Sequence, residues 1–149
     1  KDRNESKKFR LNLMDLDNED IKIDAIDFSY LVIMPSHDFQ KYCKDMSSIT
    51  DKLELICNKD KLIFKGKGDM GSAEFEVEES LGGLQIQMTS EKNIIVQGIY
   101  DLKYLLIFTK CTNLCNNVNM YLCNDYPLVV EYSVAALGKI KLLLSPSKK

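Results

Sequence analysis

The sequence is poor in the residues that carry acid–base and metal chemistry. Among its 149 residues there is one histidine, His37, and no tryptophan. No Gly-rich phosphate loop, Gly-x-Ser-x-Gly elbow or paired-histidine motif is present. Cys111 and Cys115 are close in sequence, but a zinc site needs about four ligands and no second pair accompanies them. We therefore expect no enzymatic activity, no metal and no cofactor.

Long hydrophobic runs are also lacking. No apolar stretch approaches the roughly 20 residues of a membrane-spanning helix, so we expect no membrane segment. The first ten residues, KDRNESKKFR, are polar and predict no signal peptide. The five cysteines are an odd number, which does not favour a disulfide framework. We expect reduced thiols in an intracellular protein.

Neither sign of charge dominates the chain. Lys and Arg total 20, Asp and Glu total 22, and the net charge is -2. This balance argues against a protein that coats nucleic acid by bulk charge, although it leaves room for one basic face. The apolar fraction of 45% and the charged fraction of 28% are typical of a globular domain. The length fits one domain, or one domain with an extra arm.

Periodicity predicts two copies of a strand–helix–three-strand unit. LICNKDKLIF (55–64) aligns with YLCNDYPLVV (121–130), which places Cys57 and Asn58 on Cys123 and Asn124. The first unit has a strand at 28–34, a helix at 36–48 with Ser36 as its expected N-cap, and strands at 53–58, 62–67 and 73–78. The second has strands at 84–88 and 93–99, a helix at 101–110, and strands at 118–123, 128–134 and 139–144. We predict an α+β domain with both helices on one face.

The N-terminal part of the chain predicts a strand followed by an acidic connector. Residues 8–13 alternate apolar and polar side chains, as in a half-buried strand. Residues 15–27 hold six acids and one lysine, together with Ile21 and Ile23. The segment is either a solvated linker or an arm whose apolar residues dock on a partner surface.

Four lysines fall on the outer faces of the two predicted helices. Lys41 and Lys44 lie opposite the apolar stripe of the first helix, and Lys103 and Lys110 belong to the second. They are either ordinary solubilising charges or one positive stripe. Such a stripe would contact phosphates without reading bases.

Several motifs resemble the eukaryotic sliding clamp family of proliferating cell nuclear antigen. They are LMDLD (13–17), Met34-Pro35-Ser36, KDMSSI (44–49), LSPSKK (144–149) and above all PLVVEY (127–132). The similarity runs from about Lys8 to Lys148. It implies a DNA clamp fold and covers the second half of a clamp protomer. Residues 1–14 would be the last strand of a preceding clamp domain, 15–27 the interdomain connecting loop, 28–146 the C-terminal clamp domain and 147–149 its tail.

The resemblance also implies site residues. Lys41, Lys44, Lys103 and Lys110 would face duplex DNA. Lys59 stands where the family carries a regulatory ubiquitin or SUMO attachment. Phe28 and Leu143 stand where the family commonly has tyrosine, which makes the expected peptide groove more apolar. That groove, which receives a Gln, an aliphatic residue and two aromatics, would be formed by Ile21, Ile23, Phe28, Pro127, Leu143, Ser145 and Pro146. The subunit interface would pair Lys8, Phe9, Arg10 and Leu11 with Ala73, Glu74, Phe75, Glu76 and Val77 of another protomer.

The resemblance implies a non-enzymatic DNA sliding clamp that acts as a processivity factor. Its expected partners are double-stranded DNA, DNA polymerase and other proteins with clamp-binding peptides, and a clamp loader. The intact protein would be a nuclear homotrimer. This chain alone, with one clamp domain, would not close a normal ring. The alternative is a clamp-like paralogue or checkpoint-clamp subunit that binds peptides without sliding on DNA.

Overall fold

The computed structural model describes residues 28–89, 94–134 and 138–147. The strand expected at 8–13 and the acidic connector at 15–27 lie outside these residues, as do Ile21 and Ile23. Among the described helices, none is long and apolar enough to cross a membrane.

Both predicted repeats are present in chain order. The elements are β1 (Tyr30–Pro35), α1 (Ser36–Ser47), β2 (Lys52–Cys57), β3 (Lys61–Gly68), β4 (Gly71–Glu78), β5 (Gln85–Met88), β6 (Val96–Asp101), α2 (Leu102–Phe108), the 3-10 helix η2 (Thr109–Leu114), β7 (Asn117–Leu122), β8 (Leu128–Val134) and β9 (Gly138–Leu144). The first repeat runs from β1 to β4 and the second from β6 to β9. The predicted α+β fold is confirmed.

The two repeats exchange their first strands. One sheet has the order β5-β1-β7-β8-β9 and the other β4-β3-β2-β6, and the neighbouring strands of the described residues pair antiparallel. Strand β1 therefore pairs with the second repeat, with Val32 opposite Met120, and β6 pairs with the first, with Leu55 opposite Gly98. Because each sheet needs a strand from the other repeat, the two units form one cooperative domain.

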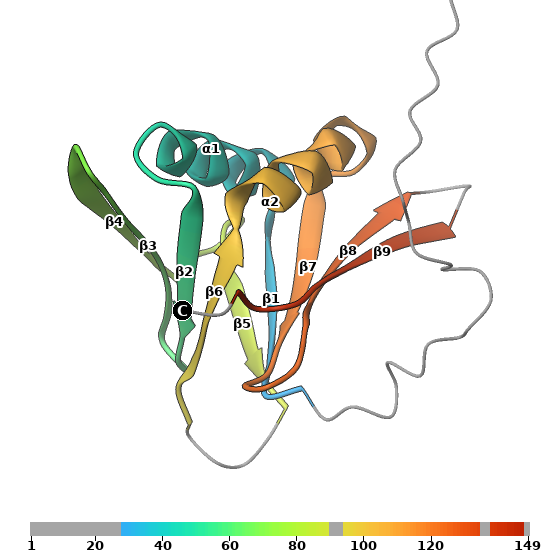
Figure 1. The fold of residues 1–149 in the computed structure, drawn as a ribbon. Coiled ribbons are helices and arrows are strands. Elements are labelled where there is room, and N and C mark those ends of the chain that lie inside the picture. The colour runs from blue at the N-terminus through green and yellow to red at the C-terminus, as the bar shows by residue number, and fades with distance from the viewer. Residues whose placement is uncertain (1–27, 90–93, 135–137, 148–149) are drawn as a thin grey trace, which may run out of the picture.

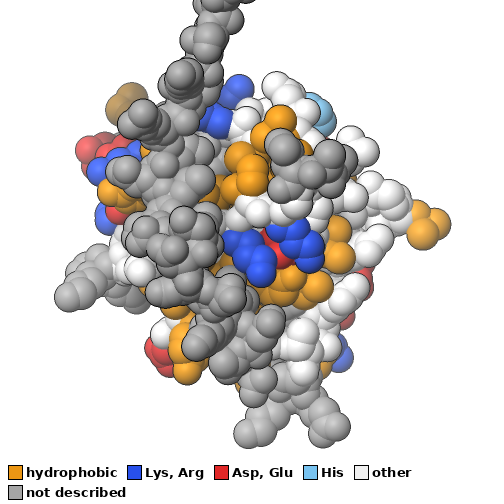
Figure 2. Space-filling model, turned by 90° about the vertical axis from the view of Figure 1, so that its right-hand side faces the viewer, with side chains coloured by type: hydrophobic (Ala, Val, Ile, Leu, Met, Phe, Trp, Pro, Cys, Tyr) orange, Lys and Arg blue, Asp and Glu red, His pale blue; other side chains and the backbone are white. Residues whose placement is uncertain are grey.

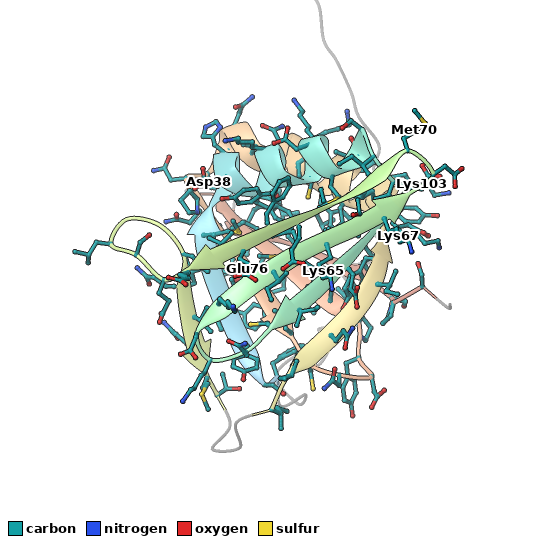
Figure 3. The ribbon with its side chains drawn as sticks, turned by 90° about the vertical axis from the view of Figure 1, so that its left-hand side faces the viewer. Asp38, Lys65, Lys67, Met70, Glu76 and Lys103 are labelled. Carbon is teal, nitrogen blue, oxygen red and sulfur yellow. The ribbon has the colours of Figure 1, made fainter. Side chains whose placement is uncertain are left out.

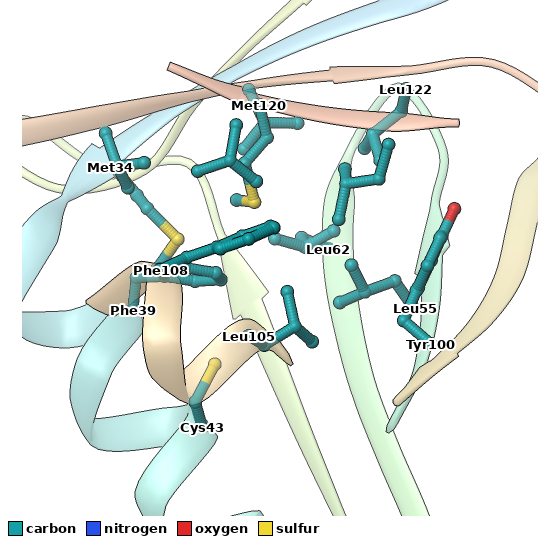
Figure 4. Packing of buried hydrophobic residues seen from close by; sticks show 14 of the residues in the cluster. Met34, Phe39, Cys43, Leu55, Leu62, Tyr100, Leu105, Phe108, Met120 and Leu122 are labelled. Atoms are coloured by element: carbon teal, nitrogen blue, oxygen red, sulfur yellow. The ribbon is translucent and has the colours of Figure 1, made fainter. Parts of the chain in front are cut away.

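Both helices lie on the same side of the strands, and α1 contacts both α2 and η2 (Figure 1). Their apolar faces close one hydrophobic core with the inner faces of the two sheets. Phe39 from α1 and Leu105 from α2 are fully buried in it, close to Phe108, Leu62 and Met120 (Figure 4). Burial of these faces leaves the opposite face of each helix in solvent.

Two helix ends differ from the prediction. Pro35, not Ser36, is the N-cap of α1, and no side chain caps that helix. The Ser36 hydroxyl is buried and donates instead to the Cys115 carbonyl at 2.6 Å, which ties α1 to the segment after η2. The second helix is shorter than expected, because Asp101 ends β6 and the chain after Phe108 tightens into η2.

Tyr132 on β8 carries a buried hydroxyl that has no hydrogen-bond partner among the described residues. The Thr112 hydroxyl donates to the Thr109 carbonyl at 2.6 Å, so its proton is not directed at Tyr132. Burial raises the pKa of Tyr132, so the phenol stays neutral. An unpaired buried hydroxyl costs about 1–3 kcal/mol of desolvation. We expect Tyr132→Phe to raise the free energy of unfolding by about 1 kcal/mol in urea denaturation.

Tyr30 supplies the matched control for that experiment. It is equally buried, but its hydroxyl donates to the Ile94 carbonyl at 2.5 Å. Tyr30→Phe leaves that carbonyl without its donor and should lower the free energy of unfolding by about 1 kcal/mol. Equal losses in Tyr30→Phe and Tyr132→Phe would mean that the Tyr132 hydroxyl is also hydrogen bonded.

Candidate functional site

The four predicted lysines lie on the helix layer, defined as α1, α2 and η2. Lys41 and Lys44 are exposed on α1, Lys103 is exposed on α2, and Lys110 is exposed on η2 rather than on the second helix. None of the four forms an ion pair with another described residue. The Lys103 ammonium lies 5.0 Å from the ring centroid of Tyr104. Elements far apart in sequence thus present exposed positive charges on one side of the molecule.

Two carboxylates moderate the charge of this layer. Asp38 and Asp45 are exposed on α1 beside its lysines, whereas α2 and η2 carry no acid. The layer therefore keeps a net positive charge on a chain whose overall charge is -2. Scattered lysines without a cluster of base-reading side chains suit a polyanion bound through its backbone, with an attraction that salt weakens.

A second surface lies on the outer face of the sheet that contains β7, β8 and β9. Phe28 packs against Val129, and the centroid of its ring lies 5.2 Å from the centroid of the Tyr121 ring. Val129 pairs with Tyr121 on one side and with Leu143 on the other. We call Phe28, Tyr121, Val129 and Leu143 the apolar row. The row crosses the sheet and ends at Leu143, whose side chain is 39% exposed.

The remaining described groove residues lie at one end of this row. Leu128 pairs with Leu144, so Pro127 and Ser145 lie at the same end of β8 and β9. Pro127 is half-buried, while Ser145 and Pro146 are exposed. On the described part of this side, hydrophobic side chains surround a few charged ones (Figure 2). The structure therefore brings together five of the seven predicted groove residues; Ile21 and Ile23 lie outside the described residues.

Glu131 underlies the outer face next to the apolar row. It is only 2% exposed, and it accepts hydrogen bonds from the Asn119 amide at 3.2 Å and the Tyr121 hydroxyl at 3.3 Å. The Lys141 ammonium lies 3.8 Å away. The hydrogen bond to Glu131 holds the Tyr121 side chain beside this carboxylate. Sequence reasoning missed Tyr121, Val129 and Glu131, although the alternation of β8 places Val129 and Glu131 on one face.

Strand β4 forms one edge of its sheet (Figure 3). Ala73, Phe75 and Val77 turn inward, and the Phe75 ring packs 5.5 Å from Tyr42 of α1. Glu76 points outward and is 3.1 Å from Lys61, and this hydrogen bond holds the pKa of Glu76 below its usual range. Glu74, like Glu76, is exposed. The outer backbone of β4 is unpaired within the described residues, which leaves it open to another strand.

Lys59 lies exposed in the turn between β2 and β3. The Asn58 side chain closes this turn, because its oxygen accepts the backbone N–H of Asp60 at 2.7 Å and of Lys61 at 3.0 Å. The turn thus presents Lys59 on a fixed, accessible support.

The thiols offer no reactive centre in the described structure. All five cysteines lie in the described residues and none of them forms a disulfide there, and burial raises the pKa of Cys43 and of Cys57 to about 12. In the part of the chain that the structure describes, no group of three or more His, Cys, Asp or Glu side chains could hold a metal ion. The surfaces found here offer charge, apolar area and an open strand edge, which are features of binding.

Comparison with known proteins gives concordant matches. The family model for the C-terminal domain of proliferating cell nuclear antigen matches residues 22–147. Proliferating cell nuclear antigen of Caenorhabditis elegans is 34% identical over 146 residues, which is 97% of this chain and 56% of that protein. A probable DNA polymerase sliding clamp of Acanthamoeba polyphaga mimivirus is 33% identical over 145 residues, or 97% of this chain and 30% of that protein. The chain thus spans about half or less of these relatives.

Proposed function

Because the chain belongs to the proliferating cell nuclear antigen family, we propose that it forms the C-terminal domain of a DNA sliding clamp. In this role it encircles duplex DNA as part of a ring of three protomers and keeps DNA polymerase on its template. The work is positional rather than enzymatic. A clamp loader would place the ring on DNA in the nucleus.

The observation that carries this proposal is the helix layer with its four exposed lysines. A ring that slides must attract the duplex without gripping one sequence. Ammonium groups on long side chains provide a screened, non-specific attraction to phosphates. The two aspartates of α1 keep this attraction weak, which suits movement along the duplex.

The apolar row and the β4 edge support the other two parts of the role. The row, together with Pro127, Ser145 and Pro146, would receive the aliphatic and aromatic side chains of partner peptides. Strand β4 would pair with a strand such as residues 8–13 of the next protomer and so remove an exposed sheet edge. Lys59 remains a candidate for regulatory modification.

The decisive experiment uses DNA topology. The full-length protein that carries this chain is loaded on nicked circular DNA, isolated by gel filtration, and then treated with a restriction enzyme. We expect the ring to remain on circular DNA and to leave after linearisation, because only a ring that encircles DNA can slide off an end. Equal retention on both forms would contradict encirclement.

The alternative is a paralogue that binds partner peptides but does not slide on DNA. It would show peptide binding together with no retention on circular DNA. The exposed lysines of the helix layer favour the clamp over this scaffold, because a peptide-binding scaffold has no need of them.

A further inference from the structure

The end of the chain ties one sheet to the other. We call residues 145–147 the C-terminal segment; it follows β9 and runs to β6 (Figure 1). The backbone N–H of Ser147 donates to the Ile99 carbonyl at 2.6 Å, and its hydroxyl donates to the Asp101 carboxylate at 3.2 Å. Within the described part of the chain, the segment makes no other hydrogen bond.

Asp101 uses its carboxylate in an unexpected way. It occupies the N-cap position of α2, where aspartate commonly accepts a backbone N–H, yet it makes no side-chain cap. The first helical N–H, that of Leu102, donates to the Asp51 carbonyl at 2.9 Å. The carboxylate accepts from the Lys52 ammonium at 3.0 Å and from Ser147. It is therefore committed to β2 and to the C-terminal segment rather than to its own helix.

Lys52 stabilises the charged form of this anchor. Lys52 pairs with Asp101 across β2 and β6, and its hydrogen bond is the main cause that holds the pKa of Asp101 below its usual range, with Ser147 and Lys103 adding to it. The carboxylate is therefore ionised at neutral pH. Hydrogen bonds to an ionised acceptor are stronger than those between neutral groups.

We propose that Asp101 is a positioning residue for partner peptides: by holding Ser147 against β6, it fixes Ser145 and Pro146 beside Leu143. This inference rests on the peptide-docking part of the proposed function. A released segment would have to be ordered again each time a peptide binds, and that ordering weakens affinity. Asp101 thus acts on the peptide through the C-terminal segment.

The test replaces Asp101 by serine, which can cap α2 but cannot provide the charged acceptor. Glu76→Gln is the matched control, because Glu76 also pairs with a cross-strand lysine, at 3.1 Å, but lies on β4. We expect the Ser147 amide to exchange with solvent about 3- to 10-fold faster in Asp101→Ser, measured by NMR. The Kd of a fluorescent peptide with a Gln-x-x-Ile-x-x-Phe-Phe core should rise about two- to fivefold. The melting temperature should stay unchanged or rise.

Each readout can overturn the proposal. Unchanged exchange at Ser147 in Asp101→Ser would show that Asp101 does not hold the segment. Faster exchange with an unchanged peptide Kd would remove the positioning role. A lower melting temperature would mean that Asp101 supports α2 after all. If the unmodified chain bound no peptide, the docking function itself would fail, while the exchange measurement would still decide whether Asp101 anchors the segment.

Discussion

Reversing the charge of Lys41, Lys44, Lys103 and Lys110 to glutamate should abolish binding of duplex DNA. The binding constant K falls as salt rises, and each phosphate contact contributes about -0.9 to the slope of log K against log salt. Loss of four contacts should therefore reduce the magnitude of that slope by about 3 to 4. Placing four acids on the helix layer adds repulsion to the loss. We expect affinity at low salt to fall at least about 100-fold, measured by fluorescence anisotropy across a salt series.

The control for this variant reverses four lysines elsewhere and changes the net charge equally. None of these four belongs to α1, α2 or η2: Lys65 and Lys67 lie on β3, Lys139 on β9 and Lys59 in the β2–β3 turn. This control should keep most of the DNA affinity. An equal loss in both variants would mean that overall charge, and not the helix layer, attracts DNA. Peptide affinity should survive in both, which separates the clamp from a peptide-binding scaffold.

Local patterns were enough to predict the elements of the fold. Alternation identified strands such as β3 and β4, and the spacing of Phe39, Cys43 and Met46 identified α1. These signals depend on which face of an element is buried, so they survive in a single sequence. The internal repeat followed from the same patterns and predicted the two helices.

The order of the strands in the sheets and the contacts between distant residues could not be predicted from the sequence. The repeats predicted one α+β domain but not its strand order, in which β1 and β6 each complete the sheet of the other repeat. Ser36 resembles an N-cap, but a tertiary contact with the Cys115 carbonyl claims its hydroxyl. Asp101 was expected to begin a helix, and its carboxylate binds residues 49 positions before and 46 positions after it. In each case a distant partner overrides a local preference.

The candidate site shows the same division. Helical spacing placed the lysines on outer faces, and the two helices lie in one layer as the repeats predicted, although Lys110 lies on η2 rather than on the second helix. The family resemblance supplied Phe28 and Leu143 for the groove. Tyr121 and Val129, which join them, were found only through strand register, because pairing across β7, β8 and β9 has no local signal.

Leu143→Asp should abolish peptide binding to the chain. Leu143 ends the apolar row, and its side chain is 39% exposed, so it offers apolar area that a peptide can bury. A carboxylate there would be desolvated by the peptide without gaining a partner. Loss of an apolar anchor that a peptide buries costs about 2 kcal/mol, or about 30-fold in Kd. Titration of a fluorescent peptide with a Gln-x-x-Ile-x-x-Phe-Phe core measures this change.

Leu81→Asp provides the comparison, since Leu81 is fully exposed in the segment between β4 and β5. It makes the same chemical change away from the apolar row and should leave the Kd unchanged. Both variants should keep the melting temperature, because neither side chain is part of the core. If Leu143→Asp bound the peptide as tightly as the unmodified chain, the docking surface would lie elsewhere, and the row of Phe28, Tyr121, Val129 and Leu143 would be only a packed sheet face.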